Sequence, residues 1–306
     1  MKVFLTGATG YVGQRLLSGL LEDKIDIRAL VRKQSINKIN NDVRNRLEIV
    51  NGDVTDIKSI SGLLNECEAV IYVPGLLREF RGKGISFQAI HLEGVQNLIS
   101  EATRSGVKRF ILISANGVSR NASTEYLKTK YDAEECLKQS NLNWTILRPS
   151  VIFGDEEKGY QNFISVILDL LKMMPFFVPV IGNGEYRFQP ISIQNLSEVI
   201  TRCIRLPETC EKVYHLCGKE IFSYNELIDI ISSLLEKKKI RLHLPLGIMM
   251  LISKYFGKYK WFPVSHDQIT MLLEENICHG EIRIYEEFGI RPILFSEYYQ
   301  SKKIQS

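Results

Sequence analysis

The sequence predicts an α/β fold in which a doubly wound parallel sheet is followed by a smaller, mostly helical C-terminal cap. Short apolar segments alternate with helical patterns over the first half of the chain, and three glycines separate the first segment from its helix. Beyond Gly154 the alternation gives way to mainly helical patterns. Strands and helices that alternate at this spacing form parallel sheets with right-handed crossovers. We therefore expect a first domain over residues 1–155, to which segments within 187–218 return, and a cap over 156–306.

Three glycines, Gly7, Gly10 and Gly13, follow the apolar segment that predicts the first strand, Val3–Leu5. Apolar residues then recur at helical spacing from Val12 onward. In such a turn the first glycine permits a sharp bend, the second leaves room for a pyrophosphate, and the third lets the helix pack against the strand. The N-terminus of the helix attracts an anion through its N–H groups and its dipole. The turn therefore predicts a dinucleotide site, and the alternative is a glycine turn without a ligand.

A basic pair, Arg32 and Lys33, follows the second predicted strand, Ile25–Val31. In a doubly wound sheet, an acidic residue about 20 residues beyond the glycines binds the ribose 2′-OH of NAD, whereas an arginine accommodates the 2′-phosphate of NADP. The sequence has the arginine and no carboxylate at this position. It therefore favours NADP(H) over NAD(H), and the alternative is a solvated basic turn.

The remaining elements follow from the same patterns. Further strands are predicted at Leu47–Val50, Ala69–Val73, Phe110–Ile113 and Trp144–Leu147, with helices at Phe87–Ser105 and Thr124–Lys138. Asp53 lies after the third strand, where its side chain would reach an adenine ring or, alternatively, cap a helix over Ile57–Leu64. Later segments predict helices at Phe163–Met174 and Leu196–Ile204, an extended stretch at Tyr186–Ile191, and a strand at Val213–Leu216.

Tyr126 and Lys130 are the candidate catalytic pair. They lie four residues apart in the helix that follows the strand ending at Ser114, so they share one helix face. An ammonium group beside a phenol lowers the phenol pKa and binds the nicotinamide ribose, while the tyrosine acts as a general acid toward a carbonyl. A second pair at this spacing, Tyr298 and Lys302, has no strand before it and is expected by chance.

Several motifs together resemble the extended or atypical branch of the short-chain dehydrogenase/reductase superfamily, whose members have a Rossmann domain. These motifs are, in order, Thr6–Gly13, Gly52-Asp53-Val54, Tyr126-x-x-x-Lys130 and Arg148–Gly154. Four further motifs indicate a smaller group within this superfamily. Its members are atypical and resemble the 39-kDa NADPH-binding accessory subunit of respiratory complex I. These four motifs are His91-x-x-Gly94-x-x-Asn97, Val107–Phe110, Gly182-Asn183-Gly184 leading to Phe188-Gln189-Pro190, and Gln268–Leu272.

The resemblance implies a role for each matching residue. The pyrophosphate would lie on the turn formed by Gly7, Ala8, Thr9, Gly10, Tyr11 and Val12. Arg32 would bind the 2′-phosphate, with Asp53 and Val54 at the adenine. The ribose would be lined by Val73, Pro74 and Gly75. The nicotinamide would have Tyr126 and Lys130 beside it and Pro149, Ser150 and Val151 behind it.

The chain departs from the family pattern at two positions. Extended-branch enzymes carry Ser or Thr two residues beyond the first serine at the end of the fifth strand, where this chain has Asn116. Ser114 is retained at the cofactor site but lies too deep to orient a substrate. Asn116 would donate a hydrogen bond to a carbonyl, yet an amide cannot relay a proton as a hydroxyl does. Asn195 stands where relatives often have an aspartate.

Composition limits the other classes of function. The 306 residues are 45% hydrophobic and 24% charged with a net charge of +4, as in an ordinary soluble globular protein. Basic residues are spread along the chain, which argues against nucleic acid as a ligand. The six cysteines form no C-x-x-C pair, so we expect reduced thiols in a cytosolic compartment. Scattered His and Cys residues argue against a metal site.

The start of the chain is expected to be neither a signal nor a transit peptide, and no segment is expected to span a membrane. The apolar segment Leu244–Ile252 is followed by a basic, aromatic stretch over residues 254–262. That combination would suit a membrane surface. A core helix with a polar end is the interpretation we favour. A cytoplasmic protein, with peripheral membrane association as an alternative, is therefore expected.

Two functions remain open on the sequence alone. The first is an NADP(H)-dependent oxidoreductase or epimerase-like enzyme that acts on a small carbonyl or alcohol through Tyr126, Lys130 and Asn116. The second is a protein that holds NADP(H) without turnover, as a structural subunit, a redox sensor or an assembly protein of a respiratory complex. Asn116 favours the second function, and the preserved Tyr126 and Lys130 pair favours the first.

Overall fold

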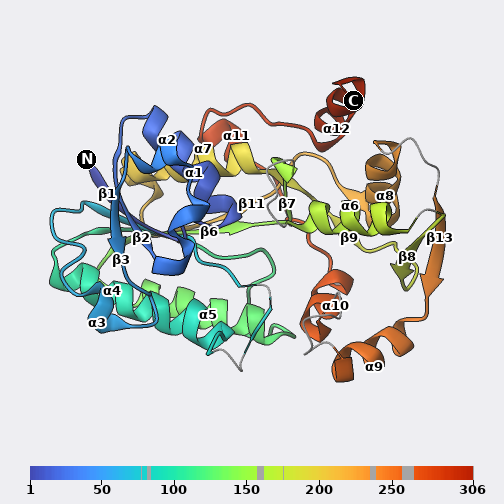
Figure 1. The fold of residues 1–306 in the computed structure, drawn as a ribbon, viewed down its shortest axis with the longest axis horizontal. Helices are drawn as coiled ribbons and strands as arrows, with labels where there is room; N and C mark the ends of the chain where they lie inside the picture. The colour runs from blue at the N-terminus through green and yellow to red at the C-terminus, as the bar shows by residue number, and fades with distance from the viewer. Residues whose placement is uncertain are drawn as a thin grey trace. The chain divides into compact units, whose positions relative to one another are not determined.

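The computed structural model describes residues 1–76, 78–80, 84–156, 162–174, 176–234, 239–256 and 265–305 (Figure 1). Contacts divide the chain into two compact units. Unit 1 comprises Met1–Arg148 and Leu196–His215. Unit 2 comprises Pro149–Asn195 and Leu216–Ser306. The motifs from which the sequence predicts a nucleotide site, except Pro149–Val151, belong to unit 1.

Unit 1 is built on a seven-stranded sheet in the order β11-β6-β5-β4-β1-β2-β3. Its strands are β1 (Lys2–Thr6), β2 (Asp26–Val31), β3 (Glu48–Asn51), β4 (Ala69–Tyr72), β5 (Arg109–Ile113), β6 (Asn143–Pro149) and β11 (Lys212–Leu216). β1 pairs in parallel with both β2 and β4, so the strand order reverses at β1. The predicted doubly wound parallel sheet is confirmed. In such sheets the ligand crevice opens at the carboxyl ends of the strands beside this reversal.

Helices cover both faces of the sheet, with α1 and α7 on one side and α4 and α5 on the other (Figure 1). The helices are α1 (Tyr11–Glu22), α2 (Asn41–Arg44), α3 (Ile57–Ile60), α4 (Gly94–Arg104), α5 (Glu125–Lys138) and α7 (Ile193–Arg205). β4 and β5 are buried throughout because both of their faces are covered. Short helical segments lie at η1 (Lys33–Lys38), η3 (Gln88–Glu93) and η5 (Pro207–Thr209).

Two of the predicted helices differ in detail from the observed ones. The predicted helix Phe87–Ser105 begins as the π-helical segment η3 and continues as α4. The helix predicted over Ile57–Leu64 is only the four-residue α3. Its cap is Asp56, whose side chain accepts a hydrogen bond from the Lys58 N–H at 3.1 Å, so the alternative cap role for Asp53 is wrong.

Unit 2 combines helices with three two-stranded sheets. The helices are α6 (Phe163–Met173), α8 (Tyr224–Ser233), α9 (Leu246–Phe256), α10 (His266–Leu273), α11 (Ile284–Glu287) and α12 (Phe295–Gln305). The strand pairs are β7 (Ile152–Phe153) with β10 (Ile191–Ser192), β9 (Arg187–Phe188) with β12 (Phe222–Ser223), and β8 (Phe177–Ile181) with β13 (Ile240–Leu244). Aromatic rings, among them Phe153, Phe188 and Tyr299, fill the core.

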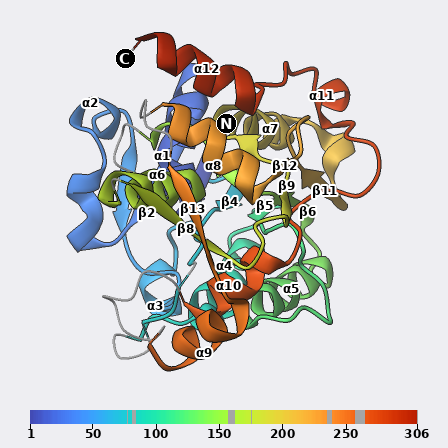
Figure 2. The same ribbon diagram turned by 90° about the vertical axis from the view of Figure 1, so that its right-hand side faces the viewer.

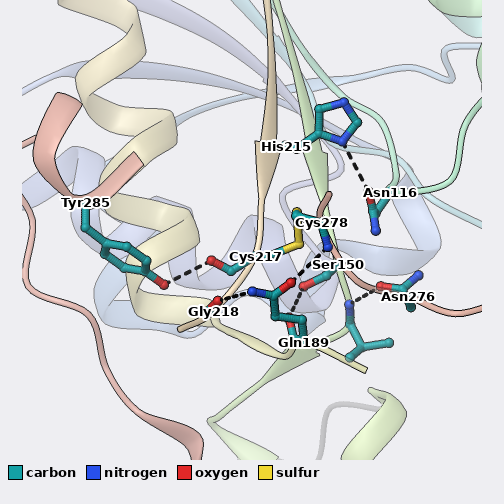
Figure 3. Close-up of a disulfide and its surroundings, with 10 residues drawn as sticks. Asn116, Ser150, Gln189, His215, Cys217, Gly218, Asn276, Cys278 and Tyr285 are labelled. Carbon is teal, nitrogen blue, oxygen red and sulfur yellow. Dashed lines mark hydrogen bonds between the residues drawn. A yellow bond between two sulfur atoms is a disulfide. The ribbon is translucent and has the colours of Figure 1, made fainter. Parts of the chain in front are cut away.

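The expectation that all six cysteines are reduced is wrong for two of them. Cys217 and Cys278 form a disulfide in unit 2 although 61 positions separate them (Figure 3). The spacing gave no sign of this pair because only the fold brings the two residues together. Cys67, Cys136, Cys203 and Cys210 are free thiols.

The favoured core-helix interpretation of Leu244–Ile252 is also wrong. This segment forms most of α9, in which Ser253 is the buried residue and large apolar side chains are exposed. Of the basic, aromatic stretch that follows, residues 257–264 lie outside the described part of the chain. Among the described residues, no helix has both the length and the apolar content needed to cross a bilayer.

Candidate functional site

The glycine turn after β1 has the geometry that a bound pyrophosphate requires. Gly7 has a φ of +77°, a conformation that favours glycine, and a Cβ there would lie 3.0 Å from Pro74 N. A Cβ on Gly13 would lie 2.1 Å from the Gly7 carbonyl oxygen, so the helix packs against the turn with no room for a side chain. A Cβ on Gly10, by contrast, would meet only the Gly7 oxygen, at 3.4 Å. The space beside Gly10 is therefore open to a ligand.

The N-terminus of α1 follows directly from this turn and suits an anion. Gly10 is the N-cap residue, no side chain caps the helix, and its first turn contains no acidic residue. The first N–H groups of a helix have no acceptor within the helix, and the helix dipole places positive charge there. Ala8 is buried beneath the turn, while Thr9, Tyr11 and Val12 are partly exposed around it. These features fit a diphosphate group.

Arg32 and Asp53 lie near each other at the ends of β2 and β3. The Arg32 Nη1 atom is 3.9 Å from Asp53 Oδ2, and the two side chains are 47% and 35% exposed. The other carboxylate oxygen of Asp53 accepts hydrogen bonds from the Thr55 N–H and hydroxyl. The carbonyl of Val54 accepts a bond from the Asn97 amide at 2.8 Å. Arg32 is thus held near its position by a weak, solvated ion pair.

Val73, Pro74 and Gly75 continue from β4 toward the glycine turn. Pro74 packs against Gly7, since a Cβ added to Gly7 would lie only 3.0 Å from Pro74 N. Val73 and Pro74 are partly exposed and Gly75 is exposed. The turn after β1 and the segment after β4 therefore lie together at the carboxyl edge of the sheet.

Tyr126 and Lys130 share the buried face of α5, which Thr124 caps through its hydroxyl. The Lys130 ammonium lies 5.7 Å from the centroid of the Tyr126 ring and donates to the Ile113 carbonyl at 3.1 Å. Burial lowers the pKa of Lys130 to about 8, partly offset by Glu134. Burial raises the pKa of Tyr126, so the expected lowering by Lys130 is not what this structure shows.

His91 packs beside Tyr126, a position that the sequence patterns for metal ligands and catalytic pairs do not indicate. Its ring makes an edge contact with Tyr126 at 5.2 Å and stacks on Phe87. Nε2 accepts a hydrogen bond from the Leu76 N–H at 3.1 Å, so Nδ1 carries the proton toward Thr129 Oγ1, also at 3.1 Å. Burial and the charge of Lys130 lower its pKa to about 2. The only sequence signal was its place in the His91-x-x-Gly94-x-x-Asn97 motif.

Ser114 and Asn116 follow β5, and each has a partner within unit 1. The Ser114 hydroxyl donates to Glu134 Oε1 at 2.5 Å. His215 Nδ1 lies 3.2 Å from Asn116 Oδ1, and because a carbonyl oxygen only accepts, the imidazole donates (Figure 3). Ser114 is thus bonded to a buried carboxylate, and Asn116 accepts a hydrogen bond through its side-chain oxygen.

Pro149, Ser150 and Val151 belong to unit 2. Polar groups of Ser150 (Figure 3) and the N–H of Val151 are already bonded there. The Ser150 hydroxyl donates to the Gln189 carbonyl at 2.6 Å, and its N–H donates to the Leu216 carbonyl at 3.0 Å. The Val151 N–H donates to Asn276 Oδ1 at 3.1 Å. The segment is therefore fixed within its own unit.

The amide of Asn195 gives a physical reason for the second departure from the family pattern. Its Nδ2 donates to the Arg291 carbonyl and its Oδ1 accepts from the Ile293 N–H, each at 2.8 Å. A carboxylate would accept the second bond but has no proton for the first. Asn195 thus fixes the segment before α12 without burying a charge.

Residues 7–165, more than half of the chain, match the NAD(P)H-binding protein family. The chain belongs to this family. The 40 kDa subunit of mitochondrial NADH-ubiquinone oxidoreductase from Neurospora crassa is 22% identical over 292 residues, which cover 94% of this chain and 74% of that protein. UDP-glucose 4-epimerase from Vibrio cholerae is 26% identical over 314 residues, with 95% and 90% covered.

The fold of this NAD(P)H-binding protein is similar to that of a nucleoside-diphosphate-sugar epimerase from Staphylococcus aureus. The TM-score is 0.76 at 20% identity, over 98% of this chain and all of the other. The resemblance to atypical short-chain dehydrogenases/reductases and to the complex I accessory subunit is thereby confirmed. The relatives include an epimerase and a respiratory-complex subunit, as both sequence-based hypotheses anticipate. Among the described residues, no cluster of His, Cys, Asp or Glu is arranged to hold a metal ion.

Proposed function

We propose that this protein binds NADP(H) on unit 1 and catalyses an oxidoreductase or epimerase-like reaction with Tyr126 as the proton donor and acceptor. The position of Tyr126 carries the proposal. Its ring is fixed by Phe87 and His91, with Lys130 four residues along the same helix face. Among the described residues, none forms a hydrogen bond with the Tyr126 hydroxyl, which leaves that group for a substrate oxygen.

The structure supports the dinucleotide by fit. The open side of Gly10 and the uncapped N-terminus of α1 would hold the diphosphate. Arg32 would bind the 2′-phosphate, with Asp53 and Val54 at the adenine and Val73–Gly75 along the ribose. Ser114, bonded to Glu134, would form the floor of the nicotinamide site. The nicotinamide supplies or accepts the hydride when it is bound.

The remaining chemistry belongs to residues of this chain. Tyr126 gives its phenolic proton to the substrate oxygen as a carbonyl becomes an alcohol, and takes it back in the reverse direction. The Lys130 ammonium stabilises the phenolate that forms, because opposite charges attract strongly in a buried site. His91 stays neutral and fixes the orientation of the Tyr126 ring. Asn116 would donate an amide hydrogen bond to the same substrate oxygen.

The test is a search for turnover with purified protein. Bound NADPH is looked for by its fluorescence, and a panel of carbonyl compounds is screened for NADPH oxidation. We expect Tyr126→Phe to lose turnover about 100-fold or more while NADPH affinity stays the same, since general acid catalysis contributes roughly 10²- to 10⁴-fold. Tyr131→Phe, on the same helix, is the matched control and should retain activity. Wild-type protein that binds NADPH tightly but never turns over would reject the catalytic role.

The preference for NADP(H) rests on Arg32 and is tested separately. A charge-assisted hydrogen bond contributes about 1.5–3 kcal/mol, so we expect Arg32→Ala to weaken NADPH binding about tenfold to a hundredfold and to leave NADH binding unchanged. Lys108 lies before the amino end of β5, whereas Arg32 follows the carboxyl end of β2. Lys108→Ala removes an exposed positive charge and should change neither the NADPH nor the NADH affinity. Tighter binding of NADH than NADPH by the wild type would exclude the phosphate role.

A second candidate function is an NADP(H)-binding subunit or redox sensor without turnover. It is supported by Asn116, which replaces a proton-relaying hydroxyl and has its carbonyl oxygen bonded to His215. Under this proposal the protein retains NADPH through purification, oxidises none of it with any carbonyl, and is recovered from cells with a stable membrane-bound complex. Turnover that depends on Tyr126 would exclude it.

A further inference from the structure

Helix α9 exposes large apolar side chains along one stripe. Ile248, Leu251 and Tyr255 are 55%, 58% and 63% exposed. These residues lie three and four positions apart, so they project from one side of the helix. Soluble proteins seldom expose a contiguous apolar surface of this kind unless it binds something.

The opposite side of α9 faces the protein. Ser253 is its buried residue; its hydroxyl donates to the Met250 carbonyl at 3.0 Å and lies 3.3 Å from His266 Nδ1 of α10. A surface helix of a globular protein normally turns its apolar stripe to the core and its polar residues outward. In α9 Ser253 faces the protein beside the half-buried Met249 and Met250, and a second apolar stripe faces away. Packing within unit 2 therefore does not explain the stripe.

The apolar surface continues along the chain into the strand before α9. β13 leads through Pro245 into α9, and both lie in unit 2 (Figures 1 and 2). In the parallel pair of β8 and β13, Ile240 is in register with Phe177, and both are exposed. Val178 and Val180, on the other face of β8, lie in the core. The outer face of this strand pair is thus apolar as well.

The charge of the sequence that includes β13 and α9 indicates the partner. Residues 237–266 contain seven Lys or Arg and no Asp or Glu. These seven are Lys237, Lys238, Lys239, Arg241, Lys254, Lys258 and Lys260. Arg241 pairs with Asp229 and Lys239 donates to two carbonyls, whereas Lys254 is exposed on α9 itself. We propose that α9 and the outer face of β8 and β13 dock onto the surface of an anionic phospholipid bilayer. Basic residues attract the headgroups while an apolar helix face enters the boundary of the acyl chains. With 11 residues, α9 is too short to span the bilayer and lies along its surface.

The test is co-sedimentation of the full chain with vesicles. We expect binding to phosphatidylcholine vesicles with about a third phosphatidylglycerol, weaker binding at high salt, and little binding to phosphatidylcholine alone. Ile248→Ser/Leu251→Ser should weaken binding at least about tenfold, because two apolar side chains no longer leave water. Lys254→Glu should weaken binding to anionic vesicles. Ile57→Ser removes an apolar side chain of similar exposure from α3 and should have no effect.

Three results would overturn the proposal. The first is wild-type protein that binds neither kind of vesicle. The second is vesicle binding that is undiminished both in Ile248→Ser/Leu251→Ser and in Lys254→Glu. The third is a dimer that these variants disperse, without vesicle binding, which would assign the surface to a second copy of the chain. Thermal unfolding followed by circular dichroism checks the fold of each variant. Lys254→Glu, at an exposed position, provides the test if the double variant fails to fold.

Discussion

Glu134 accepts two hydrogen bonds from Arg148 in unit 1, from Nε to Oε1 at 2.9 Å and from Nη2 to Oε2 at 2.5 Å. Glu134 is fully buried, and its Oε1 also accepts the bond from Ser114. The pair joins α5 to β6 beneath the end of β5. Because the Ser114 hydroxyl is committed to this carboxylate, it does not orient a substrate on unit 1.

Arg148→Met should destabilise the protein by about 3–5 kcal/mol, because it removes the two-bond partner of a buried carboxylate and leaves that carboxylate with Lys138 Nζ, 3.9 Å from Oε2. The measurement is the free energy of unfolding in urea. Lys128→Met removes the partner of Glu125 in an exposed pair of the same helix and should cost less than about 1 kcal/mol. Equal effects of the two substitutions would show that the buried pair has no special importance for stability.

Alanine at Gly13 should lower stability, whereas alanine at Gly10 should weaken NADPH binding and leave stability unchanged. Gly13→Ala places a Cβ 2.1 Å from the Gly7 oxygen, and the required shift should cost at least about 1–3 kcal/mol of stability. Gly10→Ala meets nothing closer than 3.4 Å, and the φ of −88° suits alanine, so stability should be unchanged. The new methyl group would occupy the approach to the diphosphate and weaken NADPH binding about tenfold or more. Thermal unfolding and fluorescence titration measure the two effects.

Unchanged NADPH affinity in Gly10→Ala would mean that the diphosphate does not approach this glycine. Gly247→Ala in α9 is a matched control, since its added Cβ would meet nothing within 4 Å and α9 belongs to unit 2. It should alter stability little and affect the affinity less than Gly10→Ala does.

Lys130→Met should stabilise the protein in a pH-dependent way. The pKa of Lys130 falls from 10.5 to about 8 on folding, so its charged form is disfavoured in the folded state. Below pH 8 the full penalty applies, about 3 kcal/mol by the pKa difference. Between pH 8 and 10.5 the wild type gains stability as the folded state releases its proton, and above 10.5 the contribution vanishes.

After allowance for the lost bond to the Ile113 carbonyl, the variant should be about 2 kcal/mol more stable than the wild type at pH 7. The advantage should disappear above about pH 10.5. Urea unfolding of both proteins from pH 7 to 10.5 measures it, and Lys128→Met provides an exposed control with no such trend. A difference that stays constant over this range would show that Lys130 is not desolvated in the folded protein.

The sequence predicted the sheet and the glycine turn because both depend on local patterns. Buried strands read as continuous apolar segments, and Gly7 and Gly13 are required by backbone conformation and close packing. The proximity of Tyr126 and Lys130 follows from helical spacing alone. Features made by contacts between distant segments were not predicted. His91 meets Tyr126, and Glu134 meets Arg148, through tertiary packing that one sequence does not encode as a spacing.

The exposure of α9 was missed for a related reason. An apolar segment of this length has the same composition whether its helix is buried or lies at an interface, so Leu244–Ile252 was assigned to the core. Only the position of Ser253 against α10 shows which side of the helix faces the protein. The disulfide was missed because Cys217 and Cys278 are far apart in the sequence.

The Cys217–Cys278 disulfide should stabilise unit 2. Gln189 bridges the same two segments, since its amide donates to the Gly218 carbonyl at 2.8 Å and its Oε1 accepts from the Cys278 N–H at 2.9 Å (Figure 3). The disulfide closes a loop of 61 positions, for which the loss of chain entropy in the unfolded state contributes about 4 kcal/mol. We expect Cys217→Ser/Cys278→Ser to lower the free energy of unfolding by about 2–4 kcal/mol.

Dithiothreitol provides the decisive comparison, because it reduces the disulfide without changing the sequence. It should destabilise the wild type about as much as the double substitution does, and it should leave the variant unaffected. Cys136→Ser/Cys210→Ser alters two partly exposed free thiols and should retain the full response to the reductant. Mass spectrometry of the non-reduced, digested protein should show the peptides of Cys217 and Cys278 linked. If those peptides appear separately and the reductant changes nothing, the two thiols are free in solution, and hydrogen bonds such as those of Gln189 join these segments.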